Sequence, residues 1–330
     1  MTSQPGRRAL IASLLLLLPA LLAAADIRVR LFTITSPSVA TINGATVKAP
    51  ITRTFPAPVR LEIKGSKPLL LEGPLEVSST PTGKLRLIHT LPLERYVAGV
   101  LAGETNGANS GEYLQAMAIA IRTYAVRFQG KAHEGHDFCD TTHCQDLRLS
   151  AVTALQTRAA QATEGLLLWD QGRVAATYYH AHCGGHSASS PHGRYLPAKP
   201  DPYCTAKGND VWQVHYTRTE LGRALDQAAV AGLRVTKRSE SGRAETVLVN
   251  GQALHATNFM NAINRRFGWR VKSLLFDIRE EGAGFVITGR GRGHGQGICQ
   301  VGAMRMAEIG KSYRDILAFY YPGVHERACP

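Results

Sequence analysis

The sequence predicts an α+β fold. Residues 26–90 alternate apolar and polar side chains in short runs separated by proline and glycine, which is the pattern of strands joined by turns. From residue 91 onward, helix-like and strand-like runs follow one another without the regular spacing of βαβ units. A hydrophobic content of 44% supports a full core, which excludes a disordered chain.

The first 25 residues have the pattern of a signal peptide. An arginine pair precedes an apolar run over 9–22, and small residues lead up to Ala25. Cleavage after Ala25 predicts an exported protein, in the periplasm or the extracellular cell-wall space, that meets the membrane only through this peptide. A retained membrane anchor is the alternative, although the apolar run is short for a span.

The charge of the chain favours anionic partners. Its formal net charge is +13, and removal of the two signal-peptide arginines leaves 13 − 2 = +11. A basic exported protein is attracted to cell-wall polymers or lipid headgroups. Nucleic acid is excluded as a partner by the compartment and by the lack of interleaved basic and aromatic runs.

The stretch 91–145 is expected to organise the functional site. Apolar residues at helical spacing predict a helix over 93–101, with a proline in its first turn. A second helix is expected to be capped by Asn109, with Glu112 completing a capping-box-like pair, and to run to residue 128. Glu104 would then lie on a short loop between two packed helices.

The remaining elements complete the predicted organisation. Helices are expected over 151–163, 219–231, 258–267 and 300–309, followed by one that starts at a Ser312/Asp315 cap. Strands are expected over 166–169, 174–180, 246–249, 274–279 and 285–288. The predicted domains are a signal peptide over 1–25, a β-rich segment over 26–90 and one domain over 91–330.

Four blocks of sequence carry a family resemblance. They are AGE–x7–EYLQAMAIAIRTYA, CDTTHCQ, YYHAHCGGHSASS and GRGRGHGQGICQVGAMRMAEIGKSYRDILAFYYPG. In order and separation these blocks resemble the SpoIID/LytB family over residues 91–323. The resemblance implies a SpoIID-like domain that acts on peptidoglycan in the bacterial envelope. Sporulation members of that family are lytic transglycosylases, and LytB-type members are described as amidase enhancers.

Glu104 falls on the family's glutamate and is the predicted catalytic acid. A lytic transglycosylase can work with one carboxylate, which protonates the leaving glycosidic oxygen. The same group then accepts the proton of the muramic acid C6 hydroxyl as that hydroxyl attacks the anomeric carbon. In this chain Ala102–Gly103–Glu104–Thr105 replaces the family's commoner glutamate–methionine pairing.

A cluster of histidines and cysteines follows the second predicted helix. Cys139, His143 and Cys144 are ligand types of zinc, which binds four such groups in tetrahedral geometry. Similar family members bind zinc here, and the resemblance favours His133 as the fourth ligand, with His136 as the alternative. Such a zinc ion would be structural, which disfavours a zinc hydrolase. A Cys139–Cys144 disulfide is the other interpretation.

Six further residues are candidates for contact with the glycan substrate: Arg122, Tyr124, His186, Ser187, His294 and Gln300. Glycines at alternate positions over 289–297 are expected to let the backbone run close to the glycan. A dinucleotide-binding loop is disfavoured because the spacing departs from G–x–G–x–x–G and no ribose-binding acid accompanies it. Cys183 and Cys204 can form a disulfide, or share a zinc ion with His180 or His182.

The sequence therefore predicts an exported lytic transglycosylase whose partner is the glycan strand of peptidoglycan. The alternative is a non-catalytic protein that binds glycan and activates a cell-wall amidase. Only Glu104 favours the enzyme over this enhancer.

Overall fold

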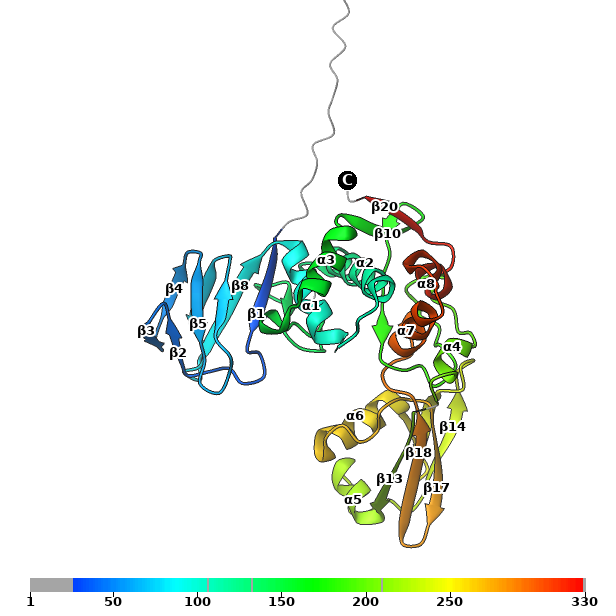
Figure 1. Ribbon diagram of the computed structural model, residues 1–330. Helices are drawn as coiled ribbons and strands as arrows, with labels where there is room; N and C mark the ends of the chain where they lie inside the picture. The colour runs from blue at the N-terminus through cyan, green and yellow to red at the C-terminus, as the bar shows by residue number, and fades with distance from the viewer. Residues whose placement is uncertain (1–25, 106, 132, 209, 329–330) are drawn as a thin grey trace, which may run out of the picture.

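The computed structural model describes residues 26–105, 107–131, 133–208 and 210–328. The signal peptide predicted over 1–25 lies outside these residues. Helices and several small sheets are mixed along the described chain, so its class is α+β (Figure 1). No helix in these ranges is long and apolar enough to cross a membrane.

The N-terminal part is built from two small sheets, with strand orders β4-β7-β8-β1-β9 and β3-β2-β5-β6. Its strands are β1 (Ile27–Leu31), β2 (Val39–Ile42), β3 (Ala45–Lys48), β4 (Thr52–Phe55), β5 (Val59–Glu62), β6 (Leu69–Leu71), β7 (Leu75–Ser79) and β8 (Leu85–Leu91). Alternate residues of β1 are buried, as the period of two predicts. The short β9 (Phe138–Cys139) pairs in parallel with β1 and so attaches the cysteine-rich segment to this sheet.

Two helices, α1 (Leu93–Glu104) and α2 (Gly111–Phe128), follow the first sheets. The cap of α2 is Ser110, whose Oγ accepts a hydrogen bond from the Tyr113 amide at 3.4 Å, and not Asn109 as expected. Glu112 takes no part in this cap. Its carboxylate accepts from the Tyr313 amide at 2.6 Å and so ties α2 to the C-terminal part of the chain.

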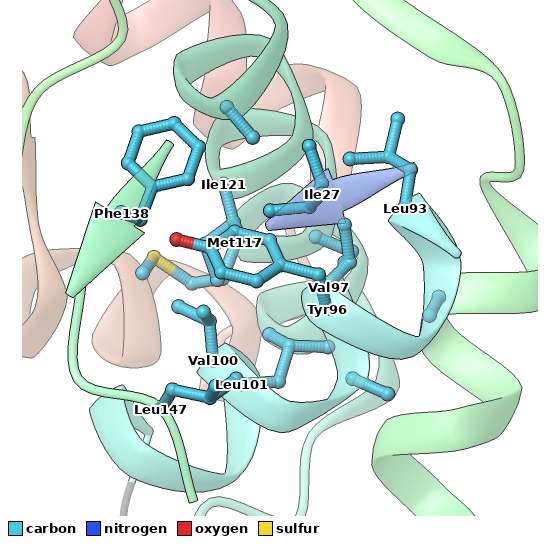
Figure 2. Packing of buried hydrophobic residues seen from close by; sticks show 14 of the residues in the cluster. Ile27, Leu93, Tyr96, Val97, Val100, Leu101, Met117, Ile121, Phe138 and Leu147 are labelled. Carbon is cyan, nitrogen blue, oxygen red and sulfur yellow. The ribbon is translucent and has the colours of Figure 1, made fainter. Parts of the chain in front are cut away.

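The two helices pack against each other through a dense apolar core (Figure 2). Tyr96 and Val100 of α1 face Met117 of α2, and Phe138 stacks on Tyr96 with ring centroids 5.4 Å apart. Alanines fill the inner face of α2 and are fully buried, which lets neighbouring elements approach closely. Burial of this apolar surface, at roughly 25 cal/mol per Å², fixes the end of α1 where Glu104 lies.

Further short elements surround the helical pair. They are η1 (Leu149–Ala151), α3 (Ala154–Ala162), β10 (Leu166–Asp170), β11 (Arg173–Val174), β12 (Tyr179–His180), α4 (Pro202–Thr205), β19 (Ile298–Cys299), α7 (Gln300–Glu308), α8 (Tyr313–Tyr320) and β20 (His325–Ala328). The strand expected over 174–180 is divided in two, since β11 forms a hairpin with β10 whereas β12 pairs in parallel with β19. The Ser312/Asp315 capping box that starts α8 is confirmed.

Residues 211–290 form a lobe with a core of its own, drawn below the helices in Figure 1. Its elements are β13 (Val211–Thr217), α5 (Arg218–Ala224), β14 (Leu233–Arg238), β15 (Ala244–Val249), β16 (Gln252–His255), α6 (Ala256–Phe267), β17 (Phe276–Glu281) and β18 (Gly284–Arg290). The first core, in contrast, runs without a break from the N-terminal strands into the helices. The described chain therefore has two separate clusters of buried residues, one in this lobe and one in the rest of the chain.

Candidate functional site

A cleft of about 650 Å³ is lined by residues of the helical body, the lobe and the glycine-rich segment after the lobe. It brings together six of the residues predicted from the sequence: Glu104, Tyr124, His143, Cys144, His294 and Gln300. Another hollow of about 490 Å³, beside the N-terminal sheets, is lined by none of the predicted site residues. The cleft is therefore the candidate site.

Glu104 is the last residue of α1 and not a loop residue as expected. Its Oε1 accepts a hydrogen bond from the Asp146 amide at 2.8 Å. This contact depends on the preceding glycine, because a Cβ at Gly103 would lie 2.1 Å from the Asp146 carbonyl oxygen. The helix end and the segment at residue 146 thus meet only because residue 103 has no side chain.

Burial raises the pKa of the Glu104 carboxyl above its usual value, and the nearby Asp146 charge acts in the same direction. Hydrogen bonds from the Asp146 amide and from the side chains of Gln300 and Tyr179 lower the pKa in part. The net effect is a rise, so the carboxyl keeps its proton to a higher pH than an exposed glutamate. Such a group is suited to general acid catalysis.

A chain of hydrogen bonds orients Tyr179 beside this carboxyl. The Tyr96 hydroxyl donates to Gln145 Oε1 at 3.0 Å, and Gln145 Nε2 donates to the Tyr179 hydroxyl oxygen at 2.9 Å. With this orientation, the Tyr179 hydroxyl can donate its hydrogen bond to the Glu104 carboxyl. Sequence reasoning missed Gln145, Asp146 and Tyr179, although the first two directly follow the Cys–His cluster.

The predicted zinc ligands come together next to the cleft. The ligand atoms of His133, Cys139, His143 and Cys144 all lie within 4.8 Å of one another. His133 Nε2 lies 3.1 Å from Cys144 Sγ, and the two sulfurs are 3.3 Å apart, longer than the ~2.05 Å of a disulfide. Two thiols and two imidazoles in this arrangement fit a tetrahedral zinc ion.

His136 lies outside this group of ligands. Its ring stacks on that of His133 with centroids 4.5 Å apart, and its Nδ1 lies 3.2 Å from both Arg86 Nη2 and the Glu134 carbonyl oxygen. His136 therefore packs behind the cluster, and the geometry favours His133 as the fourth ligand.

The cluster and the acid are joined by consecutive residues. Cys144 contributes a ligand atom, Gln145 orients Tyr179, and Asp146 donates its amide to Glu104. An ion held by the cluster would therefore fix the loop that supplies one hydrogen bond to the carboxyl, from Asp146, and one to Tyr179, from Gln145.

Comparison with known proteins identifies the family. The profile described as Stage II sporulation protein (SpoIID) matches residues 81–169. An uncharacterised protein of Brachyspira hyodysenteriae is 32% identical over 251 residues, which cover 72% of this chain and 67% of that protein. The chain belongs to the SpoIID family. Stage II sporulation protein D of Bacillus amyloliquefaciens is 28% identical over 80% of this SpoIID-family chain and 82% of its own length.

Two further matches are partial: one covers a part of this chain, and the other covers a part of the relative. The profile named Domain of unknown function (DUF8618) matches residues 209–297, a range that includes the lobe. A Bacillus subtilis protein named Amidase enhancer is 25% identical over 68% of this chain, and the match spans 39% of that protein.

Arg122 does not line the cleft of this SpoIID-family protein, which corrects the expected substrate contact. Its side chain is completely buried, and its guanidinium pairs with the Glu94 carboxylate, with Nε 2.7 Å from Oε1. A further hydrogen bond reaches the Ala160 carbonyl oxygen at 2.9 Å. Arg122 thus links α2 to α1 and α3 as a structural residue.

His186 and Ser187 also lie away from the residues that line the cleft. Ser187 is buried, and its Oγ donates to the Pro197 carbonyl oxygen at 2.9 Å and accepts from the Lys199 amide at 3.0 Å. His186 Nδ1 lies 2.8 Å from the Ser187 carbonyl oxygen. These contacts close the loop between β12 and α4, and the glycan contacts expected of His186 and Ser187 stay a prediction.

His294 faces the cleft, but both of its ring nitrogens are engaged. Nδ1 accepts from the Gln296 amide at 3.0 Å, so the proton sits on Nε2, which donates to the Tyr179 carbonyl oxygen at 3.0 Å. Desolvation lowers the pKa of His294, although the residue as a whole is exposed. The two hydrogen bonds fix the orientation of the His294 ring beside Tyr179.

The lobe side of the cleft carries residues that sequence reasoning missed. Trp269, just after α6, is 64% exposed and lines the cleft together with Lys272. Arg292 also lines it but is paired with Asp210 at 2.6 Å. On the opposite side, His180 Nδ1 bonds the Gln296 carbonyl oxygen, which leaves its buried Nε2 without a partner in the described chain.

Proposed function

We propose that this protein binds glycan strands of peptidoglycan in the cleft and cleaves them as a lytic transglycosylase. One observation carries the proposal: Glu104 is the one carboxylate among the described residues that line the cleft, and burial raises its pKa. Glycoside hydrolases ordinarily need two carboxylates, one as acid and one as base or nucleophile. Transglycosylation by the sugar's own hydroxyl needs one.

In the proposed reaction Glu104 transfers its proton to the glycosidic oxygen as the bond from that oxygen to the anomeric carbon of muramic acid breaks. The C6 hydroxyl of the same sugar then attacks the anomeric carbon, and its proton passes to the Glu104 carboxylate. A bond from O6 to C1 replaces the glycosidic bond, no water is consumed, and the carboxyl returns to its starting state. Tyr179 and Gln300 orient the carboxyl through their hydrogen bonds.

The cleft residues around Glu104 have separate proposed roles in binding. The exposed indole of Trp269 offers an apolar face for a sugar ring, since exposed aromatic side chains in grooves commonly contact ligands. Lys272 carries the charge that suits the lactyl or stem-peptide carboxylates of the substrate. Tyr124, His294 and Gln300 contribute polar groups on the other side of the cleft.

Zinc is the proposed ion of the cluster formed by His133, Cys139, His143 and Cys144. With four protein ligands, it supplies a structural cation that fixes the loop and has no open position for substrate. The residues of the chain carry out all the proton transfers.

Export to the cell envelope is part of the proposal. It is supported by the signal-peptide pattern over 1–25, by the net charge of +13 and by the names of two relatives, Stage II sporulation protein D and Amidase enhancer. The second name also supports the alternative function, in which the cleft binds glycan without cleaving it and the protein activates a cell-wall amidase.

Mass spectrometry of products from purified glycan strands tests the proposal. Transglycosylation yields 1,6-anhydro-muramic acid ends, which are one water lighter than the reducing ends that hydrolysis would leave. Reducing ends would contradict the single-carboxylate mechanism. No cleavage by the wild type, together with stimulation of an added amidase, would establish the enhancer function instead.

A further inference from the structure

A second cluster of metal-binding groups lies behind the cleft, away from the His133–Cys144 cluster. Cys183 follows β12, Cys204 lies in α4, and Cys299 ends β19. All three cysteines are free and fully buried. Their sulfurs and a carboxylate oxygen of Asp201 lie within 4.8 Å of one another.

A buried carboxylate beside three thiols is an unusual combination in an apolar core. Asp201 is 1% exposed, and a carboxylate is costly to bury among apolar groups unless it is paired. It accepts hydrogen bonds from the Cys204 amide at 3.0 Å and the Tyr320 hydroxyl at 2.9 Å. These bonds hold Asp201 Oδ2 3.4 Å from Cys183 Sγ, as neighbouring groups hold a ligating carboxylate.

Three converging thiols do not fit a disulfide, which joins two and leaves the third unpaired. We propose that Cys183, Cys204, Cys299 and Asp201 bind a second structural zinc ion. Three thiolates and one carboxylate are ligand types of zinc in tetrahedral sites. On binding, each thiol releases one proton to solvent, and four bonds to the metal form.

His182 does not complete this ligand set, although its Nδ1 lies 3.3 Å from Cys204 Sγ. Nδ1 accepts from the Gly184 amide at 3.0 Å, and Nε2 donates to the Gly208 carbonyl oxygen at 3.0 Å. Both ring nitrogens therefore have backbone partners, and Asp201 is the fourth ligand.

The surroundings supply positive charge to the site. Zinc with three thiolates and one carboxylate has a net charge of 2 − 4 = −2. Arg243 is buried beside it and donates from Nη2 to the Cys183 carbonyl oxygen at 2.9 Å, while its Nε has no partner in the described residues. A buried guanidinium is stabilised by negative charge nearby, and the proposed thiolate of Cys183 would provide it.

The site would join the segment after β12, helix α4 and the end of β19 behind the cleft. Cys299 pairs in register with His180 and directly precedes Gln300, and both of these neighbours line the cleft. Arg243, at the start of β15, brings in the lobe. The ion would thus brace the back of the cleft, while the first cluster braces the loop beside Glu104.

Elemental analysis of the purified full-length protein and its variants tests the site. The expected result is that Cys204→Ser loses one equivalent of zinc relative to the wild type, whatever the first cluster holds. Cys139→Ser is the matched variant in the first cluster. The double variant should lose both equivalents. An unchanged zinc content in folded Cys204→Ser would overturn the proposal.

X-ray absorption on the wild type keeps the proposal testable if Cys204→Ser does not fold. Two sulfurs in the first site and three in the second give a mean of about 2.5 sulfur ligands per zinc. A mean of about 2 with one equivalent of zinc would overturn the second site. An intact mass two hydrogens lighter, with a disulfide mapped between two of Cys183, Cys204 and Cys299, would do the same.

Discussion

The two sides of the cleft differ in how their residues are held. On the helical side, Glu104 is partly buried and receives several hydrogen bonds, and its neighbours continue into a metal-ligand cluster. On the lobe side, Trp269 is largely exposed, and its lobe has a separate core. Under the proposed function, the helical side would carry out the chemistry and the lobe side would bind the glycan. Changes on the first should alter kcat, and changes on the second should alter KM.

Glu104→Gln is the change expected to have the largest effect. The amide keeps the shape and can still form hydrogen bonds, but it cannot deliver a proton, so kcat should fall by about 10²–10⁴-fold while glycan binding persists. Turnover and pull-down of glycan strands measure the two properties. Glu240→Gln, on the exposed surface of the lobe, is the matched control and should leave both unchanged. Lost binding with Glu104→Gln would assign Glu104 to recognition instead.

Loss of the first metal cluster should have the next largest effect. Cys139→Ser is expected to lose one zinc equivalent and to lower the thermal midpoint, because metal binding contributes to folding free energy. Since the same loop orients Glu104, kcat should fall about 10- to 100-fold, as for other residues that support a site indirectly. His133→Gln should behave alike, whereas His136→Gln should keep its zinc. The reverse outcome for the two histidines would exchange their roles.

Trp269→Ala tests the lobe side and should have a smaller effect. Loss of an aromatic contact worth about 0.5–1.5 kcal/mol corresponds to a rise of about 2- to 12-fold in KM, with kcat unchanged. Steady-state kinetics on glycan strands of defined length separates the two constants. Ile309→Ala, an exposed apolar residue outside the cleft, is the control. A fall in kcat with no change in KM would place the lobe in the chemistry.

The smallest expected effect is that of Glu104→Gln on the free energy of unfolding and its dependence on pH. Burial raises the pKa of Glu104 in the folded protein above its unfolded value of about 4.3. Its protonated form therefore contributes stability fully below that unfolded value, and the contribution is lost as pH rises through the folded pKa. The Glu104→Gln variant carries no ionisable group at this position. Its free energy of unfolding should therefore rise relative to that of the wild type as the pH rises through this window, and the difference should persist at neutral pH. Urea unfolding at one pH below and one pH above this window measures the difference in free energy of unfolding. A variant that is stabilised relative to the wild type only at low pH would contradict the prediction.

The sequence patterns predicted the helical side better than the lobe side. Helical spacing of apolar residues predicted α1 and α2, and ligand spacing predicted a cluster that the structure brings together. Arg122 was misplaced because it lies off the apolar stripe of α2, and the sequence does not say that α3 covers that face. Trp269 follows α6 as an isolated exposed aromatic, which no periodic pattern marks. The role of Cys299 depends on a pairing of β12 with β19 across more than a hundred residues.

The lobe leaves and rejoins the helical body at one place. The Gly291 amide donates to the Asp210 carbonyl oxygen at 3.1 Å, and Arg292 pairs with the Asp210 carboxylate, so the two ends of the lobe touch. A unit with adjoining ends and its own core has the anatomy of an inserted module. Evolution can exchange or enlarge such a module without moving Glu104 or any ligand of either cysteine cluster, provided that Arg243 keeps its contact with Cys183. Differences in length among relatives should therefore concentrate between residues 210 and 291, and with them the choice of glycan.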